Sequence, residues 1–324
     1  MQSKSDRTPW IDMARGLCMM AILWIHSEAY HCEDLLTPYS MYANTVLGCF
    51  FFISGYLLYP STWQASHKYH SVWRWLLVPY IVFTLIIAAM KLLLHYGDAN
   101  WQQLLTDVVL GRASWFVAAM IVAQSVMVGV LHLSKDHLGA VAVLGVVGVI
   151  LSALVSNETG PWHISADLWS VNEALVGIVC MSMGYVYHTK EEKVCRQRQA
   201  WIAVTGVALV ILKILIWRLD LLVTFAPVRM TYPLVFYADI LCGSVFICLV
   251  MRGLPRLRIL EWTGRHCIVY YFFCGAVPMG VSWALHKIGM TGGSYPSVAV
   301  VFVLSWIVCS IVAWAVYRYT RIVR

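Results

Sequence analysis

Ten apolar stretches, each close to the length of a membrane-crossing helix, alternate with short polar segments along the chain. About 20 mostly apolar residues are enough for a helix to cross the hydrocarbon core of a bilayer. We therefore predict an all-α integral membrane protein with about ten transmembrane helices. The predicted spans are residues 10–28, 42–59, 76–95, 114–133, 138–156, 168–187, 200–217, 232–251, 267–285 and 296–317.

The charges of the connecting segments predict the orientation of these spans. Basic residues collect in every second segment, including 68–74, 190–198, 252–265 and 318–324. The intervening segments hold acids such as Glu33, Asp98 and Glu158, with only occasional basic residues. By the positive-inside rule the basic segments face the cytoplasm, so both termini are predicted to be cytoplasmic. No long polar segment interrupts the spans, which predicts one polytopic domain over residues 1–324, without a fused soluble domain, in the cell membrane.

The amino-acid composition argues against several other classes of protein. With 60% hydrophobic and 12% charged residues, the chain has too little polar surface to coat a soluble globule. The net charge of +7 sits in short loops, so we expect no nucleic-acid partner. The ten cysteines and eleven histidines show no metal-ligand spacing, which predicts no metal site. The first span is full-length and carries charges, which favours a retained helix over a cleaved signal peptide.

Within the first span, Asp12, Arg15 and His26 are side chains that lipid cannot solvate. Eleven residues separate Arg15 from His26, which returns the two to within roughly 20° of one helical face, about 16 Å apart along the axis. Singly, the arginine could reach the near surface and the histidine the far interface. Together on one stripe they favour a functional site. Asp12 is predicted to support it by pairing with Arg15.

Five segments in order carry a resemblance to a known family: Ile11–Leu17 with a histidine eleven residues after its arginine, Phe51–Leu58, Arg74–Tyr80, Ser114–Val117 and Leu260–Tyr271. In this order they resemble the acyltransferase family 3 membrane proteins, which include fucose 4-O-acetylase-like and glycan O-acetylating enzymes. The likeness covers nearly the whole chain, and ten spans is the usual number in that family.

The resemblance implies transfer of an acetyl or other short acyl group from cytoplasmic acyl-CoA to a hydroxyl of a carbohydrate or surface glycan. It makes His26 the general base, because a neutral imidazole can take a hydroxyl proton. It makes Arg15 and Arg74 the acyl-CoA ligands, because a guanidinium binds phosphates and carbonyls. Trp115 is a supporting residue in its matched segment. Acetyl-CoA is expected as donor substrate, with no permanently bound cofactor.

Two departures from the family pattern leave parts of this picture open. The family often has a second basic residue three positions before Arg74, where this chain has Ser71, and Lys68 is the nearest replacement. The family often has a late histidine where this chain reads Tyr270–Cys274, so that role is lost or has moved to His266.

Further intramembrane acids are expected to face a polar interior. Glu173 is a candidate to orient His26, with local capping or pairing as the alternative. Asp239 is at least as well explained by pairing with Lys213 or Arg229 as by catalysis. Glu28 does not share the helical face of His26 and is predicted to be an interfacial charge.

Two other functions stay open on the sequence alone. A multi-pass transporter or flippase for a lipid-linked or small polar substrate would also place charges in its spans. An acyl conduit would pass its group to a separate protein. The expected partners are acyl-CoA, a carbohydrate or lipid-linked glycan acceptor and the lipid bilayer, and a homo-oligomer is left open. The Gly-Tyr endings of Phe51–Tyr56 and Met181–Tyr185 are a faint sign of a repeat.

Overall fold

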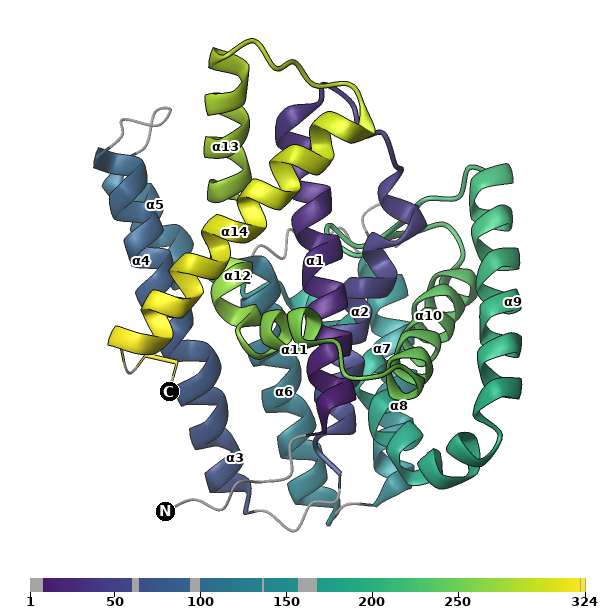
Figure 1. Ribbon diagram of the computed structural model, residues 1–324. Helices are drawn as coiled ribbons and strands as arrows, with labels where there is room; N and C mark the ends of the chain where they lie inside the picture. The colour runs from purple at the N-terminus through teal and green to yellow at the C-terminus, as the bar shows by residue number, and fades with distance from the viewer. Residues whose placement is uncertain are drawn as a thin grey trace. The chain divides into compact units, whose positions relative to one another are not determined.

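The computed structural model describes residues 8–59, 64–93, 100–135, 137–156, 168–320 and 322–323, and helices dominate it (Figure 1). The helices are α1 Pro9–His31, α2 Ala43–Tyr56, α3 Ala65–Val72, α4 Val78–Leu93, α5 Trp101–Val109, α6 Trp115–Ser134, α7 Leu138–Val155, α8 Val171–Arg196, α9 Arg198–Arg218, α10 Pro233–Gly253, α11 Arg258–Arg265, α12 Cys267–Phe273, α13 Ala276–Lys287 and α14 Tyr295–Tyr319. Short elements complete it: the 3₁₀ turn η1 Tyr39–Met41, the π-helical segment η2 Trp73–Leu77, and the hairpin strands β1 Val223–Thr224 and β2 Arg229–Met230.

The helical fold predicted from the apolar stretches is confirmed. Each of the ten predicted spans overlaps a helix in its described residues, and the span 267–285 overlaps two, α12 and α13. Among the described residues, six helices are long and apolar enough to cross a membrane, or seven if α12 and α13, bent by 51°, form one span. Three predicted spans lie on helices that are not both long and apolar enough. Helix α2 has 14 residues, and α1 and α8 are long enough but carry polar side chains. The number of ten spans and the orientation of the termini stay predictions.

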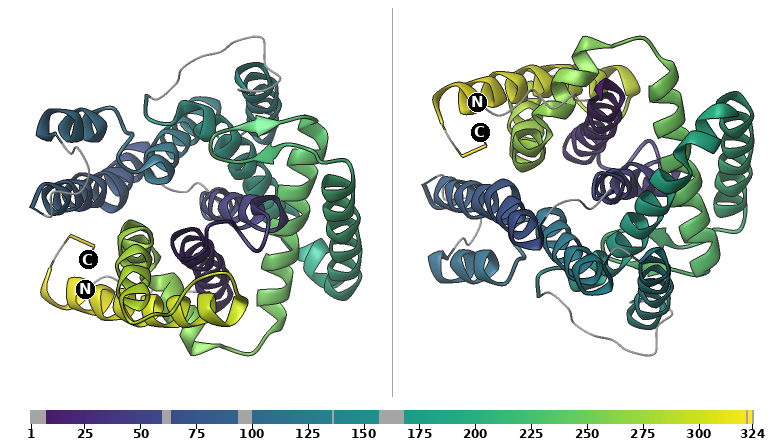
Figure 2. Two further views of the ribbon diagram at one scale, coloured as in Figure 1. Left: turned by 90° about the horizontal axis from the view of Figure 1, so that it is seen from above. Right: turned by 90° about the horizontal axis from the view of Figure 1, so that it is seen from below.

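The chain forms two compact units, and α2, α8 and α10 each run from one unit into the other. In the first unit, α1 packs against α11, α13 and α14, and α13 lies beside α14 (Figures 1 and 2). In the second unit, α3 packs against α6, α4 against α5, and α6 against α7. The first unit comprises residues 1–50, 193–219 and 238–319, and the second 51–192, 220–237 and 320–324.

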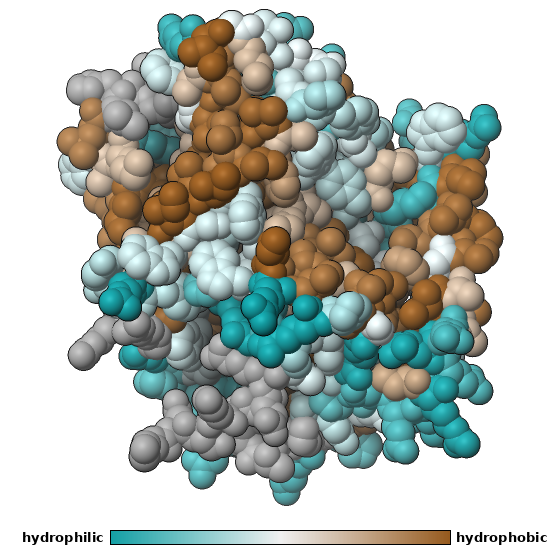
Figure 3. All heavy atoms as spheres, viewed as in Figure 1, coloured by the Kyte–Doolittle hydropathy of each residue, from teal (hydrophilic) through white to brown (hydrophobic). Residues whose placement is uncertain are grey.

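Exposed apolar surface is visible on two helices of the first unit. Figure 3 shows hydrophobic side chains along α14 and α9, with hydrophilic residues gathered at one end of α9. Val207 and Ile211 on α9, and Ile311 and Trp314 on α14, are each more than half exposed. A soluble protein rarely exposes apolar faces of this extent, whereas a bilayer covers them. This surface agrees with a multi-pass membrane protein.

The two Gly-Tyr endings noted in the sequence pack against each other within the second unit. A Cβ atom on Gly55 of α2 would overlap the backbone of Met181, and one on Gly184 of α8 would overlap the carbonyl of Phe52. Small residues allow two helix backbones to approach closely. The reciprocal contacts explain why both segments need glycine at this place.

Candidate active site

Helix α1 carries both residues of the predicted stripe in one unbroken run. Arg15 and His26 are half-buried, whereas their neighbours Ala14, Gly16 and Ser27 are buried. The imidazole of His26 stacks on Tyr30, with 6.2 Å between ring centroids. Neither Arg15 nor His26 makes a hydrogen bond or ion pair with another residue in the described part of the chain.

The short helix α11 crosses the first half of α1, and each helix has a glycine at the crossing. A Cβ on Gly16 would overlap the carbonyl of Leu260, and one on Gly264 would overlap the carbonyl of Asp12. The backbones therefore touch directly, which side chains at either position would prevent. The late segment singled out in the sequence is thus joined to the first one, although about 250 residues separate them.

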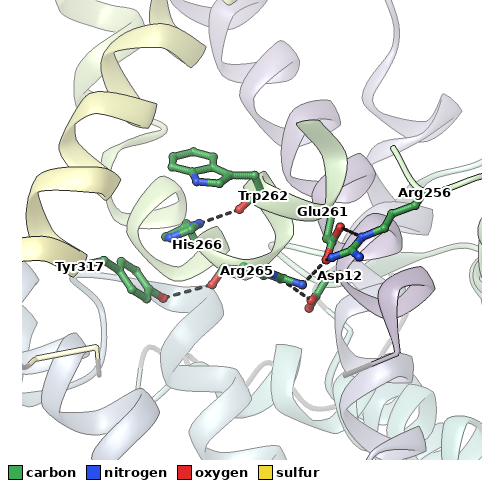
Figure 4. A network of polar contacts seen from close by, with 7 residues as sticks. All are labelled: Asp12, Arg256, Glu261, Trp262, Arg265, His266 and Tyr317. Carbon is green, nitrogen blue, oxygen red and sulfur yellow. Dashed lines mark hydrogen bonds and ion pairs between the residues drawn. The ribbon is translucent and has the colours of Figure 1, made fainter. Parts of the chain in front are cut away.

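Close contact of α1 and α11 assembles a network of alternating charges (Figure 4). Arg265 Nε donates to Asp12 Oδ2 at 3.0 Å, and Arg265 Nη2 also donates to Glu261. Arg256 binds the same carboxylate through Nε and, at 2.6 Å, through Nη2. Glu261 is buried, and the hydrogen bonds from Arg256, with the charge of Arg265, hold the pKa of its carboxyl below the usual range against the effect of burial.

The predicted ion pair between Asp12 and Arg15 does not form. Asp12 pairs with Arg265 instead, because the glycine crossing sets α11 against the carboxylate. Arg15 lies close enough to Cys267, at the start of α12, for its charge to act on that thiol. The acid three residues before Arg15 is therefore occupied by Arg265, and no ion pair joins Arg15 to an acid in the described part of the chain.

Helix α14 holds α11 and α12 in place. Tyr317 Oη donates to the carbonyl of Arg265 at 3.2 Å, and Trp306 Nε1 donates to Thr263 Oγ1 at 3.1 Å. At the break between α11 and α12, His266 Nδ1 hydrogen-bonds the carbonyl of Trp262 at 2.7 Å, and the two rings stack (Figure 4). The structure thus gives His266 a place in fixing this break.

The other predicted site residues lie in the second unit. Arg74 is exposed on the π-helical segment η2, with its guanidinium carbon 5.9 Å from the ring centroid of Trp75. Trp115 is the first residue of α6 and meets Phe116 edge to face. Glu173 is half-buried in the first turn of α8. Their joint action with Arg15 and His26 stays a prediction.

Two further acids of the first unit have surroundings that the structure shows. Asp239 of α10 pairs with Lys213 of α9 at 2.7 Å, as one of the sequence alternatives predicted. The side chain of Glu28, predicted to be an interfacial charge, is fully buried within the protein, and its place at the membrane interface stays a prediction. Its spacing from His26 indicated only a different helical face, and nothing in the sequence indicated what covers that face.

The fold and this site define a multi-pass membrane protein with a cation and an imidazole along one face of its first helix. The chain matches the acyltransferase family 3 profile, described as an acyltransferase domain, over residues 8–318. It belongs to that family and is an acyltransferase. No protein of curated function matches the chain.

Proposed function

We propose that this acyltransferase moves an acetyl or other short acyl group from cytoplasmic acyl-CoA to a hydroxyl of a carbohydrate or surface glycan. Family membership supports the acyl transfer. The CoA donor, the carbohydrate acceptor and the residue roles are parts of the proposal.

The observation that carries the proposal is the charge balance around Arg15. Asp12 is three residues before Arg15 on α1, and its carboxylate is bound by Arg265. The guanidinium of Arg15 is thus available to an anionic ligand. A fixed fork of N–H donors suits the phosphates or amide carbonyls of CoA, and Arg74 is the second proposed ligand of the donor.

His26 is the proposed base, with Glu173 as the carboxylate proposed to orient it. The imidazole takes the proton of the acceptor hydroxyl while the hydroxyl oxygen attacks the thioester carbonyl. The new C–O bond forms, the C–S bond breaks, and the CoA thiolate leaves and is protonated. An extended pantetheine arm would follow α1 for about 16 Å from Arg15 to His26.

The transporter and the acyl conduit make different predictions from this mechanism. A transporter needs no thioester cleavage, and a conduit needs a second protein to release the acyl group to an acceptor. Both therefore predict that the purified chain alone leaves acetyl-CoA intact when sugar acceptors are supplied.

Acetyl-CoA turnover by the purified chain in lipid nanodiscs, with a panel of methyl glycosides as acceptors, tests the proposal. His26→Ala should reduce kcat by about 100-fold or more, the usual contribution of a general base. Arg15→Lys should raise the KM for acetyl-CoA about 10-fold or more, because lysine keeps the charge and loses the fork.

Matched controls are available on exposed positions. His132→Ala and Arg258→Ala remove the same chemical groups from exposed sites and should leave turnover unchanged. Undiminished turnover in His26→Ala, in protein whose thermal unfolding matches the wild type, would contradict the mechanism.

A further inference from the structure

The turn between α8 and α9, in the first unit, borders a depression of about 740 Å³. Its lining is the continuous run Cys195–Ala200, which contains two arginines and two glutamines. A water molecule occupies about 30 Å³ of the liquid, so the depression has room for a ligand of many atoms. The side chains that border it are polar and basic, which indicates the kind of ligand to look for.

A third arginine, Arg252 at the end of α10, joins the two arginines of this turn. Arg252 Nη1 donates to Cys195 Sγ at 3.3 Å. A Cβ on the next residue, Gly253, would lie 3.3 Å from the guanidinium carbon of Arg198. The guanidinium groups of Arg198 and Arg252 therefore both lie where α10 ends, beside the lining of the depression.

Packing holds two of these arginines in place. The guanidinium carbon of Arg252 is 4.1 Å from the ring centroid of Trp10, a cation–π contact. Arg198 is half-buried, with its guanidinium against the backbone of Gly253. The positive-inside rule asks only for an excess of basic residues in a segment and makes no demand on their positions. Membrane orientation alone therefore does not explain why these cations are held together.

The two arginines of the turn have no acid partner in the part of the chain that the structure describes. Neither Arg196 nor Arg198 forms a side-chain hydrogen bond or ion pair there, and Arg196 is exposed. Like charges held close to one another repel. An anion that enters the depression relieves this repulsion, so the charge pattern favours an anionic ligand.

The chemistry of the lining narrows the anion to a phosphate group with hydroxyls nearby. The guanidinium fork matches two oxygens of a phosphate and binds them with charge-assisted hydrogen bonds. Gln197 and Gln199, both exposed, supply amide groups that donate to and accept from hydroxyls. A phosphate ester of a polyol such as glycerol offers both kinds of group.

The surface becomes apolar one turn into α9, which selects among phosphate compounds. Trp201, Val204, Val207 and Ile211 follow one another at intervals of three or four residues, and each is more than two-fifths exposed. They form one stripe along the helix, and Figure 3 shows the hydrophilic end of α9 giving way to hydrophobic surface. A soluble phosphate makes no use of this stripe, whereas the acyl chains of a phospholipid cover it.

We infer that Arg196, Arg198 and Arg252 form a site for the phosphate of an anionic phospholipid, whose acyl chains lie along the exposed face of α9. Basic pockets between transmembrane helices at the membrane surface are typical sites for anionic lipid headgroups. A tryptophan one turn away, Trp201, suits the boundary between headgroups and chains. The bound lipid joins the ends of α8, α9 and α10, and its binding does not depend on acyl transfer.

Lipid titration of the purified full chain in detergent tests this site. Dioleoyl-phosphatidylglycerol and dioleoyl-phosphatidylcholine have the same chains, but the choline cation offsets the phosphate charge in the second. Phosphatidylglycerol should raise the Tm of the wild type more than phosphatidylcholine at equal concentration, since a ligand of the folded state stabilises it. The double variant Arg196→Gln/Arg198→Gln should weaken phosphatidylglycerol binding about 10-fold or more, because charged hydrogen-bond donors have been lost.

A second double variant separates a defined site from the overall positive charge. Lys190→Gln/Arg258→Gln also removes two cations from exposed positions, outside the cluster, and should keep the wild-type response. Equal losses in the two double variants, or equal Tm increases with both lipids in the wild type, would overturn the inference. If Arg196→Gln/Arg198→Gln does not fold, Arg196→Gln alone replaces it, with an expected loss of about threefold or more.

Soluble anions distinguish a phospholipid from other phosphates. Inorganic phosphate, glycerol 3-phosphate and acetyl-CoA are titrated separately into the wild type and Arg196→Gln/Arg198→Gln, which should respond equally to each. A Tm increase with either small phosphate that matches the lipid effect and is lost in the variant would assign the site to a soluble ligand. The same result with acetyl-CoA would assign the arginines to the acyl donor. Either result would overturn the inference, and neither measurement depends on acyl transfer taking place.

Discussion

Single residues in the first unit show how charges inside an apolar protein are arranged in pairs. Asp12 and Glu261 are each bound by at least one arginine, and Asp239 is bound by Lys213. Removing one member of such a buried pair leaves an uncompensated charge, which is costly. Arg15 differs from these groups, and a residue that departs from the local rule is where function is expected.

Acid pH should weaken the network around Glu261. Its carboxyl has a pKa lowered in the folded state, chiefly by the hydrogen bonds from Arg256. The ionised form therefore stabilises the fold above the ordinary carboxyl pKa of 4.5, and that stabilisation is lost as the pH falls through the lower folded value. Thermal unfolding between pH 7 and pH 3 should show a drop in Tm over the acid part of this range.

The variant Glu261→Gln should lower the Tm at pH 7 and flatten its dependence on acid pH, because the titrating group has been removed. Glu192→Gln removes an exposed acid at the end of α8 and should retain the wild-type profile. If the Tm falls equally with decreasing pH in Glu261→Gln and in the wild type, groups other than Glu261 are responsible for the pH dependence.

Sequence could predict the identity of the important residues better than their partners. For Asp239 the sequence offers Lys213 or Arg229 as a partner, or a catalytic role, and the structure shows the pair with Lys213. Asp12 was paired with Arg15 from their three-residue spacing, but its partner Arg265 is 253 positions away. Helical spacing can identify neighbours on one helix, and it contains no information about which distant segment approaches.

At the scale of elements, apolar length predicted the long helices because a membrane span is defined by its own sequence. The short elements were not predicted: α11 is amphipathic and polar, η2 is a change of helix type inside a span, and the 51° bend follows α12. Each depends on contacts with other segments. The candidate site uses two of them, α11 and the start of α12.

The crossing of α1 and α11 depends on glycine at position 16. In Gly16→Ala the new Cβ would meet the carbonyl of Leu260, so the helices must separate. Forcing atoms into a packed contact costs about 1–3 kcal/mol, and we expect a loss of that size in the free energy of unfolding. The same change should reduce acyl transfer, because it displaces α11 and the partner of Asp12.

Gly280→Ala in α13 is the matched control. A Cβ at that position meets no atom within 4 Å, so alanine is accommodated without strain. Replacing a helical glycine by alanine stabilises by about 0.5–1 kcal/mol. Reversible unfolding in detergent and SDS mixtures measures both variants, and equal stability of Gly16→Ala and Gly280→Ala would contradict the packing at the crossing.

For the whole molecule, the open question is how many helices cross the bilayer. Length and apolarity of the observed helices identify six or seven among the described residues, whereas the apolar stretches of the sequence predict ten. The difference concerns α1, α2 and α8. Polar side chains explain why α1 and α8 are not apolar enough to be identified as spans from their own sequences. A span that lines a polar interior is expected to carry such groups.

Four single-cysteine variants decide between these counts. In a background without the other cysteines, the reporters are Thr8→Cys, Cys32, Tyr59→Cys and Cys195, which bracket α1, α2 and α8. Ten spans with cytoplasmic termini predict that a membrane-impermeant maleimide labels Cys32 in intact cells, and labels the other three only after permeabilisation. Thr8 and Cys32 labelled from the same side would mean that α1 does not cross. Tyr59 on the side of Cys32 would remove α2 as a span. Cys195 opposite Tyr59 would mean that an odd number of the four predicted spans between them cross, which removes α8 where α4, α6 and α7 cross. Because Arg15 is proposed to bind a cytoplasmic donor and His26 to act farther along the same helix, a crossing α1 is the one result that the proposed reaction requires.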